Sequence, residues 1–503
     1  MAFFYPIAVA SAFLILTILG TLITGRRGPL SHLPGPWYSK YTSLISKYHW
    51  LRGHQPAYVH RLHQQYGPVV RVAPDFADLC DISAKQTIYS TKEVYLKTSF
   101  YSDLTNRQDR NVFATQNIEA HRRHRRLLQG PMSETSLKVL EPIVRSRIDL
   151  AIARMVEAVR TKGFVDVYHW TLLMTTDVIG ELTFGESFRT LEAGTQSQYI
   201  TDLQSIGRAG SIGVAFPGLL PFVAKFPFLR VIPAANKTAM AVRRLTTYGQ
   251  ESMARYHRLV SSDKLVQPTV FTKVFKAEAD ETLTLDEITH NARAYLIGGS
   301  DTTAHTLTYL LWCVCKHSNV RDRLVKEIRT NLPAEFSDAD TPADRLPYLH
   351  CVIEETLRLY SAAPGGLPRQ VPAQGAYLGC YWFPGGVTVT CQAYSLHRDP
   401  TIFTNPDAFE PDRWAEGRVT KRMKDAFMAW GGGARMCIGL HLARMELRQT
   451  AALFFRNFPD ARVSTAEGMS DADMEPSIHF LLSPKGQRCC IEGSLPPAEG
   501  ISQ

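Results

Sequence analysis

Hydrophobic positions recur with the period of an α-helix over several long segments of the chain. The longest runs from Leu285 to Cys315, where Ile288, Leu296 and Leu307 follow helical spacing and acidic residues occupy the first turn. The same period predicts three further helices, over Ser133 to Val159, Leu349 to Tyr360 and Leu440 to Phe455. Helices therefore account for most of the expected core.

Strand-like patterns are short and few. Tyr66 to Val72 and Ala77 to Ile82, separated by a short turn, predict a strand pair, and Val387 to Thr390 predicts one more short strand. No repeat, low-complexity tract or Gly/Ser linker interrupts the chain between Pro36 and Ser494. We therefore expect one large, mainly α-helical domain with small β-sheets.

An uncharged apolar stretch precedes this domain. Phe3 to Thr24, about 22 residues, would reach roughly 33 Å as a helix, against a hydrocarbon core of about 30 Å. Arg26 and Arg27 follow at once, which orients the rest of the chain towards the cytosol. A cleaved signal peptide is the alternative, but the segment lacks a charged n-region and is long for an h-region. We expect a single-pass N-terminal anchor in the endoplasmic reticulum membrane and a cytosolic domain.

Four parts of the chain follow from this reading. Residues 1–27 form the anchor, 28–45 a Pro/Gly hinge, 46–494 the folded domain and 495–503 a flexible tail. The hinge contains Leu33-Pro34-Gly35-Pro36, which cannot continue a helix. It would set the angle between the anchor and the domain.

Composition excludes several classes of protein. With 45% hydrophobic and 20% charged residues, the chain can bury a large core, so general disorder is excluded. The net charge of +9 is small for 503 residues and does not indicate a nucleic-acid partner. The nine cysteines are odd in number and scattered, so we expect a reducing compartment and no disulfide framework.

The segment Trp430 to Gly439, Trp-Gly-Gly-Gly-Ala-Arg-Met-Cys-Ile-Gly, combines features that suit binding of a flat ligand. Glycines allow close backbone approach, and the helix that follows directs unpaired N–H groups towards Cys437, which should lower the pKa of its thiol. Arg435 suits a carboxylate on the ligand. A buried structural cysteine beside a glycine turn is the alternative, but it would not require this whole combination.

This segment resembles the haem-binding loop of the cytochrome P-450 family of haem-thiolate monooxygenases, with Trp430 where phenylalanine is more usual. The resemblance implies the cytochrome P-450 fold, haem b as the cofactor and Cys437 as the axial thiolate ligand of its iron. It also places Gly433, Arg435 and Gly439 in the cofactor-binding loop.

Two further patterns occur in the order that the family has them. Glu355-Thr356-Leu357-Arg358 matches its Glu-x-x-Arg motif, and Pro411-Asp412-Arg413-Trp414 matches its Pro-Glu-Arg-Phe box with two substitutions. Alone, Glu-x-x-Arg indicates little, because surface ion pairs at this spacing are common. By resemblance, Glu355, Arg358 and Arg413 form a buried charge network that holds the core around the haem.

Inside the longest predicted helix lies Gly298-Gly299-Ser300-Asp301-Thr302-Thr303. A glycine in mid-helix costs about 1 kcal/mol relative to alanine, so a special geometry is the sharper explanation. Helix packing by glycine, with Ser and Thr bonding back to the helix, is the alternative. The segment is similar to the family's acid–alcohol pair, which implies that Asp301 and Thr302 deliver protons to bound oxygen.

The run His121-Arg122-Arg123-His124-Arg125-Arg126 is basic, a pattern that usually marks a solvated face. In the family, Trp-x-x-x-Arg at this place contacts a haem propionate; here His121 and Arg125 occupy its two ends. The missing tryptophan is a departure, although histidine can still donate a hydrogen bond. By resemblance, Arg369 is a further propionate partner.

These motifs predict a membrane-anchored monooxygenase that inserts one oxygen atom of O₂ into a lipophilic small molecule. No flavin or nicotinamide motif is evident, so the resemblance implies electrons from an NADPH-cytochrome P-450 reductase, with a cytochrome b-type donor as a helper. The chain is similar to fungal enzymes of secondary metabolism, including polyketide and terpenoid pathways. A haem-thiolate isomerase or dehydratase working without reductase, and a non-catalytic haem-binding sensor, remain the alternatives.

Overall fold

The computed structural model describes residues 20–495 except 21, 24, 93, 106–110, 220–221, 223–232, 262–268, 277–282, 334, 338–340 and 342–343. The expected membrane segment, Phe3 to Thr24, therefore lies almost wholly outside the described residues, as does nearly all of the expected tail. Within the described part, no helix has both the length and the apolar character needed to cross a bilayer.

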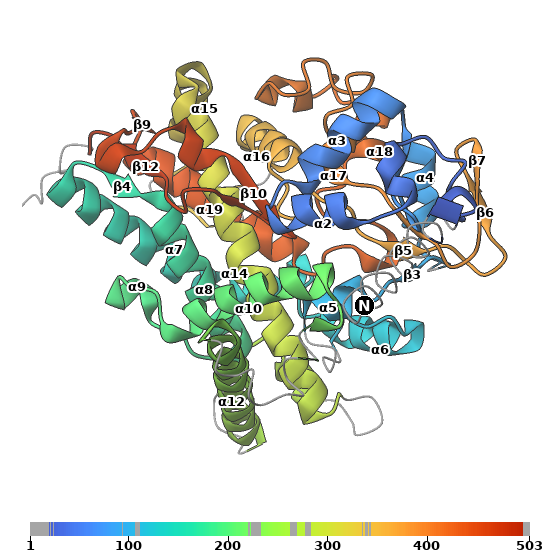
Figure 1. Cartoon of the computed structure of the whole chain (residues 1–503). Helices are drawn as coiled ribbons and strands as arrows, with labels where there is room; N and C mark the ends of the chain where they lie inside the picture. Colours follow the sequence, from blue (N-terminus) through green and yellow to red (C-terminus); the bar gives the residue numbers. More distant parts are fainter. Residues whose placement is uncertain are drawn as a thin grey trace, which may run out of the picture.

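Helices dominate the described chain (Figure 1). The α-helices are α2 (Leu44–Leu51), α3 (Gln55–Tyr66), α4 (Ile82–Ile88), α5 (Phe100–Leu104), α6 (Ile118–Gln129), α7 (Glu134–Lys162), α8 (Val167–Phe184), α9 (Thr190–Ala193), α10 (Gln198–Ala215), α12 (Pro233–Ser261), α13 (Thr272–Lys276), α14 (Leu285–Lys316), α15 (Ser318–Asn331), α16 (Pro347–Leu359), α17 (Ala393–Leu396), α18 (Lys421–Ala426) and α19 (Leu440–Asn457). Short 3₁₀ turns are η1 (Trp37–Lys40), η5 (Pro411–Trp414), η6 (Gly433–Arg435), η7 (Ala466–Gly468) and η8 (Asp471–Met474).

The strands are short and form small sheets. They are β1 (Val69–Ala73), β2 (Phe76–Leu79), β3 (Leu96–Lys97), β4 (Val165–Asp166), β5 (Arg369–Gln370), β6 (Ala376–Leu378), β7 (Tyr381–Phe383), β8 (Thr388–Thr390), β9 (Arg462–Val463), β10 (Pro476–His479), β11 (Leu481–Pro484) and β12 (Cys490–Glu492). The largest sheet has the order β1-β2-β8-β5-β3, with β2 and β8 parallel and the other pairs antiparallel. Smaller sheets pair β10 with β11, β6 with β7, and β4-β12-β9.

Helix α14 runs through the middle of the molecule and packs against α8, α19, α12 and α16 (Figure 1). It begins at a capping box: the Thr284 hydroxyl accepts from the Glu287 backbone N–H, and the Glu287 carboxylate accepts from the Thr284 N–H. Its C-terminal half is buried almost all round, in one apolar core shared with α7, α8 and α19. This burial fixes the helix that carries Asp301 and Thr302.

The predicted elements are confirmed within a few residues. The helices expected from Leu285, Ser133, Leu349 and Leu440 are α14, α7, α16 and α19, and Ser133 caps α7 by accepting from the Ser136 N–H. The expected strand pair is the antiparallel pair β1–β2, with an irregular register near its turn. The mainly α-helical architecture with small β-sheets is therefore confirmed.

The predicted hinge is held against β1 by one buried guanidinium. Arg71 donates hydrogen bonds to the carbonyl oxygens of Leu30 (3.1 Å), Leu33 (2.5 Å) and Pro36 (3.3 Å), and its own N–H donates to the Pro34 oxygen (2.8 Å). The Arg71 side chain is fully buried. The Pro/Gly segment is thus docked on the domain rather than extended away from it.

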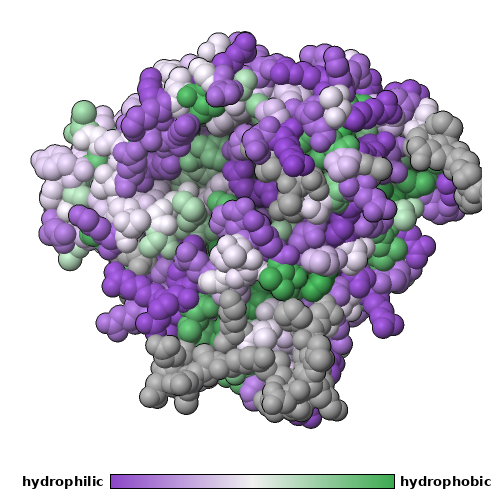
Figure 2. All heavy atoms as spheres, turned by 180° about the vertical axis from the view of Figure 1, so that it is seen from behind, coloured by the Kyte–Doolittle hydropathy of each residue, from purple (hydrophilic) through white to green (hydrophobic). Residues whose placement is uncertain are grey.

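The outer surface is mainly hydrophilic on the face turned away from Figure 1, with hydrophobic residues gathered in small patches (Figure 2). Such a surface is ordinary for a globular protein, because polar groups alone cannot cover it. Large apolar residues fill the core of the described chain, which also encloses a few charged side chains, among them Arg71, Glu355 and Arg358.

Candidate active site

Cys437 lies at the end of a tight glycine loop that precedes α19. The Cys437 N–H donates to the Trp430 oxygen (2.9 Å), which closes the loop, and the Met436 N–H donates to the Gly433 oxygen (3.1 Å). The 3₁₀ turn η6 occupies the middle of the loop. These bonds fix the position of the cysteine at the N-terminal end of α19.

Two glycines of the cysteine loop are needed for different physical reasons. Gly433 has φ +59°, and a Cβ there would lie 2.2 Å from the Tyr89 oxygen, so only glycine lets the loop pack against the chain after α4. At Gly439 an added Cβ would meet the Met132 side chain at 3.7 Å and the Cys437 sulfur at 4.0 Å. Gly433 therefore positions the loop through protein contacts, whereas Gly439 borders the sulfur itself.

The pKa of the Cys437 thiol is raised, not lowered as the sequence suggested. Desolvation by the surrounding protein is the main cause, while the Gly439 backbone N–H and the Arg125 guanidinium act in the opposite direction. The expectation of a lowered thiol pKa is therefore wrong for the chain alone, because desolvation outweighs the helix terminus and the cation. A coordinated metal ion deprotonates a thiol outright, so a thiolate here depends on metal binding.

Among the nine cysteines, Cys437 and Cys380 are the two with exposed side chains. Cys380 follows Gly379 in the short turn between β6 and β7 and does not precede a helix as Cys437 does. Cys489 and Cys490 are buried at β12, and burial raises the pKa of both thiols, as it does for Cys313 in α14. Buried thiols of this kind are chemically inert, so Cys437 is the candidate ligand.

Three cationic side chains line one recess of about 290 Å³, including its open mouth, beside the cysteine loop: Lys97, Arg369 and Arg435. Lys97 donates to the Phe113 carbonyl, Arg369 to the Tyr101 hydroxyl (2.5 Å) and Arg435 to the Thr115 carbonyl (3.0 Å). The cations come from β3, β5 and the cysteine loop, far apart in the sequence. Such convergence suits a ligand that carries two carboxylates.

Sequence reasoning identified Arg369 and Arg435 but missed Lys97. A single lysine in a two-residue strand carries no local signal, and only the pairing of β3 with β5 brings it beside Arg369. Its amino group also lies 4.1 Å from the centre of the Tyr101 ring, a cation–π contact.

Helix α6 carries the basic run, and its two histidines face inward while Arg122, Arg123 and Arg126 face outward. His121 is buried near the cation cluster: desolvation and then the positive charges of Arg435 and Lys97 lower its pKa to about 3. His121 is thus neutral at physiological pH and offers a hydrogen bond instead of a charge. The structure therefore brings His121 to the side of the cations.

Arg125 lies on the cysteine side of the loop. Its guanidinium donates to the Met436 carbonyl oxygen (2.5 Å) and to the Gln129 side chain (3.0 Å), and it acts electrostatically on Cys437. In this structure Arg125 therefore supports the backbone next to the sulfur, and it does not line the recess formed by Lys97, Arg369 and Arg435.

The two mid-helix glycines of α14 differ in their surroundings. An added Cβ at Gly299 would come within 2.7 Å of Ile179 in α8, so this glycine permits close helix packing. An added Cβ at Gly298 would meet nothing within 4 Å. Gly298 therefore faces open space, and the Thr302 hydroxyl donates back to its carbonyl oxygen (2.5 Å). Close helix packing therefore explains Gly299, and an open local geometry explains Gly298.

Asp301 lies beside Thr302 with its side chain partly buried. Desolvation raises the pKa of the Asp301 carboxyl to about 6, close to neutral pH. No hydrogen bond or ion pair of its side chain occurs within the described part of the chain. A carboxyl of this pKa can both hold and release a proton at physiological pH, as a proton-transfer group must.

Glu355, Arg358 and Arg413 come together in a buried network. Both Glu355 and Arg358 are fully buried and share two hydrogen bonds of 2.8 Å, and the Arg413 Nε donates to Glu355 at 2.9 Å. His397, whose role the sequence did not reveal, accepts from the Met428 N–H (2.8 Å) and shares a hydrogen bond with the Arg358 carbonyl oxygen (2.8 Å). The network thus reaches the segment leading into the cysteine loop.

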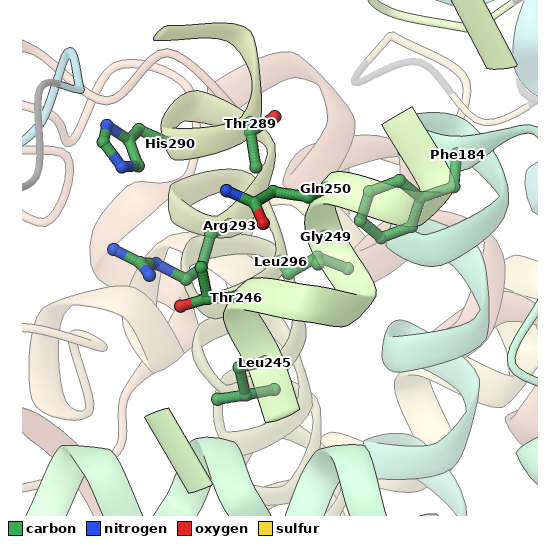
Figure 3. Close-up of a pocket in the computed structure, with 9 residues that line it drawn as sticks. All are labelled: Phe184, Leu245, Thr246, Gly249, Gln250, Thr289, His290, Arg293 and Leu296. Carbon is green, nitrogen blue, oxygen red and sulfur yellow. The ribbon is translucent and has the colours of Figure 1, made fainter. Parts of the chain in front are cut away.

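A second recess, of about 310 Å³ including its open mouth, lies between α8, α12 and α14 (Figure 3). His290 and Arg293 project from α14 on one side, and Phe184 from the end of α8 lies on the other. It includes none of the cysteine-loop or cation-cluster residues, so it is separate from the candidate site.

The arrangement fits a haem. The glycine loop presents one accessible sulfur, the cation cluster provides partners for two propionates, and Gly298 leaves space along α14. In the described residues no group of three His, Cys, Asp or Glu side chains is placed to hold a bare metal ion. A metal at Cys437 would therefore need its other ligands from a cofactor.

Comparison with known proteins also indicates a haem-binding protein. The cytochrome P450 family model matches residues 34–491. The chain is 44% identical over 481 residues to cytochrome P450 monooxygenase tazI of Aspergillus terreus, covering 95% of this chain and 97% of the relative. It is 38% identical to cytochrome P450 monooxygenase orf2 of Aspergillus niger (97% and 98% covered) and 33% identical to cytochrome P450 monooxygenase stcB of Emericella nidulans (92% and 88%).

A family match over nearly the whole chain carries the family's cofactor and reaction type with it. The cofactor is haem with a cysteine thiolate as axial ligand, and the enzyme is an oxidoreductase of the monooxygenase type. With the glycine loop, the cation cluster and the buried Glu–Arg network in the places this chemistry requires, the chain belongs to the cytochrome P450 family of haem-thiolate monooxygenases.

Proposed function

We propose that the enzyme oxidises a lipophilic small molecule of fungal secondary metabolism, with Cys437 as the axial ligand of the haem iron. The observation that supports this most strongly is the accessible Cys437 sulfur in a closed glycine loop, next to a recess lined by three cations. The relatives named above come from Aspergillus terreus, Aspergillus niger and Emericella nidulans, which supports the fungal setting.

When bound, the haem supplies oxygen activation, and thiolate ligation favours cleavage of the O–O bond. The chain contributes binding and orientation. Lys97, Arg369 and Arg435 would hold the propionates, with His121 as a neutral hydrogen-bonding neighbour. Arg125 would steady the backbone beside Cys437. The network of Glu355, Arg358 and Arg413 would keep the loop and α16 in fixed relative positions.

Asp301 and Thr302 would hold and move protons on α14, next to the open space beside Gly298. The Thr302 hydroxyl now donates to the Gly298 carbonyl, and rotation of its side chain would turn it towards the space beside Gly298. Asp301, with its pKa raised to about 6, would supply the proton. An Asp301 with an ordinary pKa would be ionised at neutral pH and a poorer donor.

An aromatic cluster between α5 and the β10–β11 turn supports a lipophilic substrate. The Phe100 and Phe113 rings lie 6.0 and 5.8 Å from the Phe480 ring, and all three side chains are partly buried. They adjoin the cation cluster, because Tyr101 contacts Phe113 (5.5 Å) and accepts from Arg369. Apolar, aromatic linings of this kind bind apolar ligands. The oxidation would be hydroxylation, epoxidation, desaturation or a multistep sequence.

Electron delivery would come from an NADPH-cytochrome P450 reductase, with a cytochrome b-type protein as a second donor. Exposed cations on α6 and α18 support this, since both helices lie near the cysteine loop: the exposed set is Arg122, Arg123, Arg126, Lys421, Arg422 and Lys424. Lys85 of α4 donates to the carbonyls of Asp425 (2.6 Å) and Phe427 (2.9 Å), so the end of α18, which leads towards the cysteine loop, is held against α4. Complementary charge of this type mainly accelerates encounter.

We also propose that residues 1–27 and the hinge 28–45 attach the enzyme to the endoplasmic reticulum membrane. The domain over 46–494 would then lie in the cytosol, followed by a tail at 495–503. Exposed apolar side chains on η1 and α2 support the membrane attachment, with Trp37 76% exposed. Ile212 in α10 and Phe216 just after its end are also exposed, and α2 is joined to α10 by the Trp50 indole donating to the Ser211 oxygen (2.9 Å). Lys47 lies over the Phe216 ring (5.4 Å). Exposed apolar side chains gathered on elements that follow the hinge suit contact with lipid.

The test is expression of the full chain with a reductase, followed by metabolite profiling. Reductase- and NADPH-dependent formation of an oxygenated product supports the proposal. Product formation without reductase would instead indicate an isomerase or dehydratase, and ligand binding without NADPH consumption a sensor. Thr302→Ala should divert NADPH towards peroxide; tightly coupled turnover in that variant would contradict the proton-delivery role.

A further inference from the structure

His305 is a buried histidine that the function described above does not use. It lies on α14 with 6% of its surface exposed, one helical turn after Asp301. Its ring stacks on Tyr168 of α8, with 5.7 Å between ring centres and an interplanar angle of 5°. This stacking and the burial of the side chain restrict the orientation of the imidazole.

The two ring nitrogens have different partners. The ring donates a hydrogen bond to the Leu482 backbone carbonyl of β11, and Nδ1 is buried with no hydrogen-bond partner. The donor is therefore Nε2, which leaves Nδ1 as an acceptor in the neutral ring. Burial lowers the pKa of His305 to about 4, so the ring stays neutral at physiological pH. A buried acceptor without a partner carries a free-energy cost that a function would explain.

His305 follows Asp301 by four residues on α14, and in the described residues the two side chains make no hydrogen bond or ion pair with each other. Residues four apart share one face of a helix, and each side chain leans towards the helix N-terminus, so the His305 ring lies over the turn that begins at Asp301. Around this pair, the titratable groups are Tyr168 from α8 and Tyr309 one turn later on α14, while Glu446 from α19 meets α14 at Thr303. The Asp301 side chain makes no hydrogen bond or ion pair in the described chain.

We propose that His305 is a positioning residue for Asp301: when the Asp301 carboxyl is protonated, its side chain turns towards Nδ1 of His305, which accepts a hydrogen bond from it and holds that proton ready for delivery to Thr302. This rests on the proposed function of Asp301 and deepens it. The transfer is of a proton alone: the Asp301 O–H bond breaks when the proton passes towards Thr302, and the carboxylate is protonated again from solvent. His305 remains neutral throughout, since Leu482 fixes its tautomer.

The test compares two substitutions of His305 in the haem-loaded full chain. His305→Asn places an amide oxygen near the position of Nδ1 and so keeps the hydrogen-bond acceptor. His305→Phe keeps a ring stacked on Tyr168 but removes the acceptor. Infrared difference spectra report the carbonyl band of protonated Asp301, assigned by its loss in Asp301→Asn. His305→Phe should shift this band and lower its titration midpoint by about 1 pH unit, as expected for one hydrogen bond to the protonated form. His305→Asn should leave both near wild type.

Turnover provides the second readout. The share of NADPH lost as peroxide should rise several-fold in His305→Phe and stay low in His305→Asn. The double variant Asp301→Asn/His305→Phe should be no worse than Asp301→Asn alone, because His305 acts through Asp301. An unchanged band in His305→Phe, or equal shifts in both His305 variants, would overturn the proposal. Absence of reductase-dependent product in the wild type would instead refute the proposed function, while the infrared band still tests the hydrogen bond.

Discussion

Replacing Glu355 with glutamine removes one charge from a buried ion network and keeps the shape of the side chain. The Glu355 carboxylate accepts from Arg358 Nε and Nη2 (both 2.8 Å), and from Arg413 Nε, the Glu410 N–H and Trp414 Nε1 (each 2.9 Å). A glutamine offers one oxygen and one NH₂ group to these donors. At least one guanidinium then faces another donor and loses its counter-charge.

The expected loss of folding free energy follows from the burial of these groups. Glu355 and Arg358 are fully buried, and removal of one member of a buried ion pair costs about 3–5 kcal/mol, because a charge is left uncompensated. The neighbouring pair Arg323–Asp412 makes a matched control. Its side chains are 54% and 48% exposed, and an exposed pair contributes at most about 1 kcal/mol.

Urea unfolding of the haem-loaded chain, followed by circular dichroism, measures both effects. The free energy of unfolding should fall by about 3–5 kcal/mol in Glu355→Gln and by no more than about 1 kcal/mol in Asp412→Asn. Urea is chosen because it carries no charge and does not screen the pairs. Equal losses in the two variants would refute the reasoning, since they would show that burial does not determine the strength of this network.

Three further predictions concern α14, α19 and the cation cluster. Gly298→Ala should raise the free energy of unfolding by about 1 kcal/mol through helix propensity, whereas Gly299→Ala should lower it because its Cβ would meet Ile179 at 2.7 Å; chemical denaturation tests the opposite signs. Burial raises the pKa of Glu446 to about 8, so between pH 4.5 and 8 the folded chain keeps a proton that the unfolded chain releases. The stability of the wild type should therefore fall relative to Glu446→Gln by up to about 1.4 kcal/mol per pH unit as pH rises through this window; parallel pH curves would contradict this. Lys97→Gln should accelerate haem transfer to apomyoglobin about tenfold, through loss of one charge-assisted hydrogen bond, and an unchanged rate would exclude Lys97 from propionate binding.

Local patterns in the sequence predicted the elements that have one polar and one apolar face. Ser133 caps α7 as expected, and the acidic first turn of α14 includes the Glu287 of its capping box. Helix α8 was not predicted, because it is buried nearly all round and has no polar face to produce a helical period. The sheet order β1-β2-β8-β5-β3 joins segments far apart in the chain, which no local pattern reveals.

The residues of the candidate site also fall into two groups: those that a local sequence pattern reveals and those that only the fold reveals. Cys437, Asp301 and Thr302 lie in motifs of contiguous residues, so a resemblance was enough to select them. Lys97 and His305 are isolated in the sequence, and only the pairing of β3 with β5 and the packing of α14 against α8 show their surroundings. The direction of the Cys437 pKa was mispredicted because desolvation depends on the whole fold rather than on the adjacent helix terminus.

The central claim is that Cys437, and no other cysteine, binds the haem iron. The most direct measurement is the carbon monoxide difference spectrum of the reduced, purified chain, compared among the wild type, Cys437→Ala, Cys380→Ala and Cys489→Ala. The wild type and the variants at positions 380 and 489 should all give the thiolate-type band, and Cys437→Ala should lose it. Persistence of that band in Cys437→Ala, or its loss in either of the other two variants, would contradict the account.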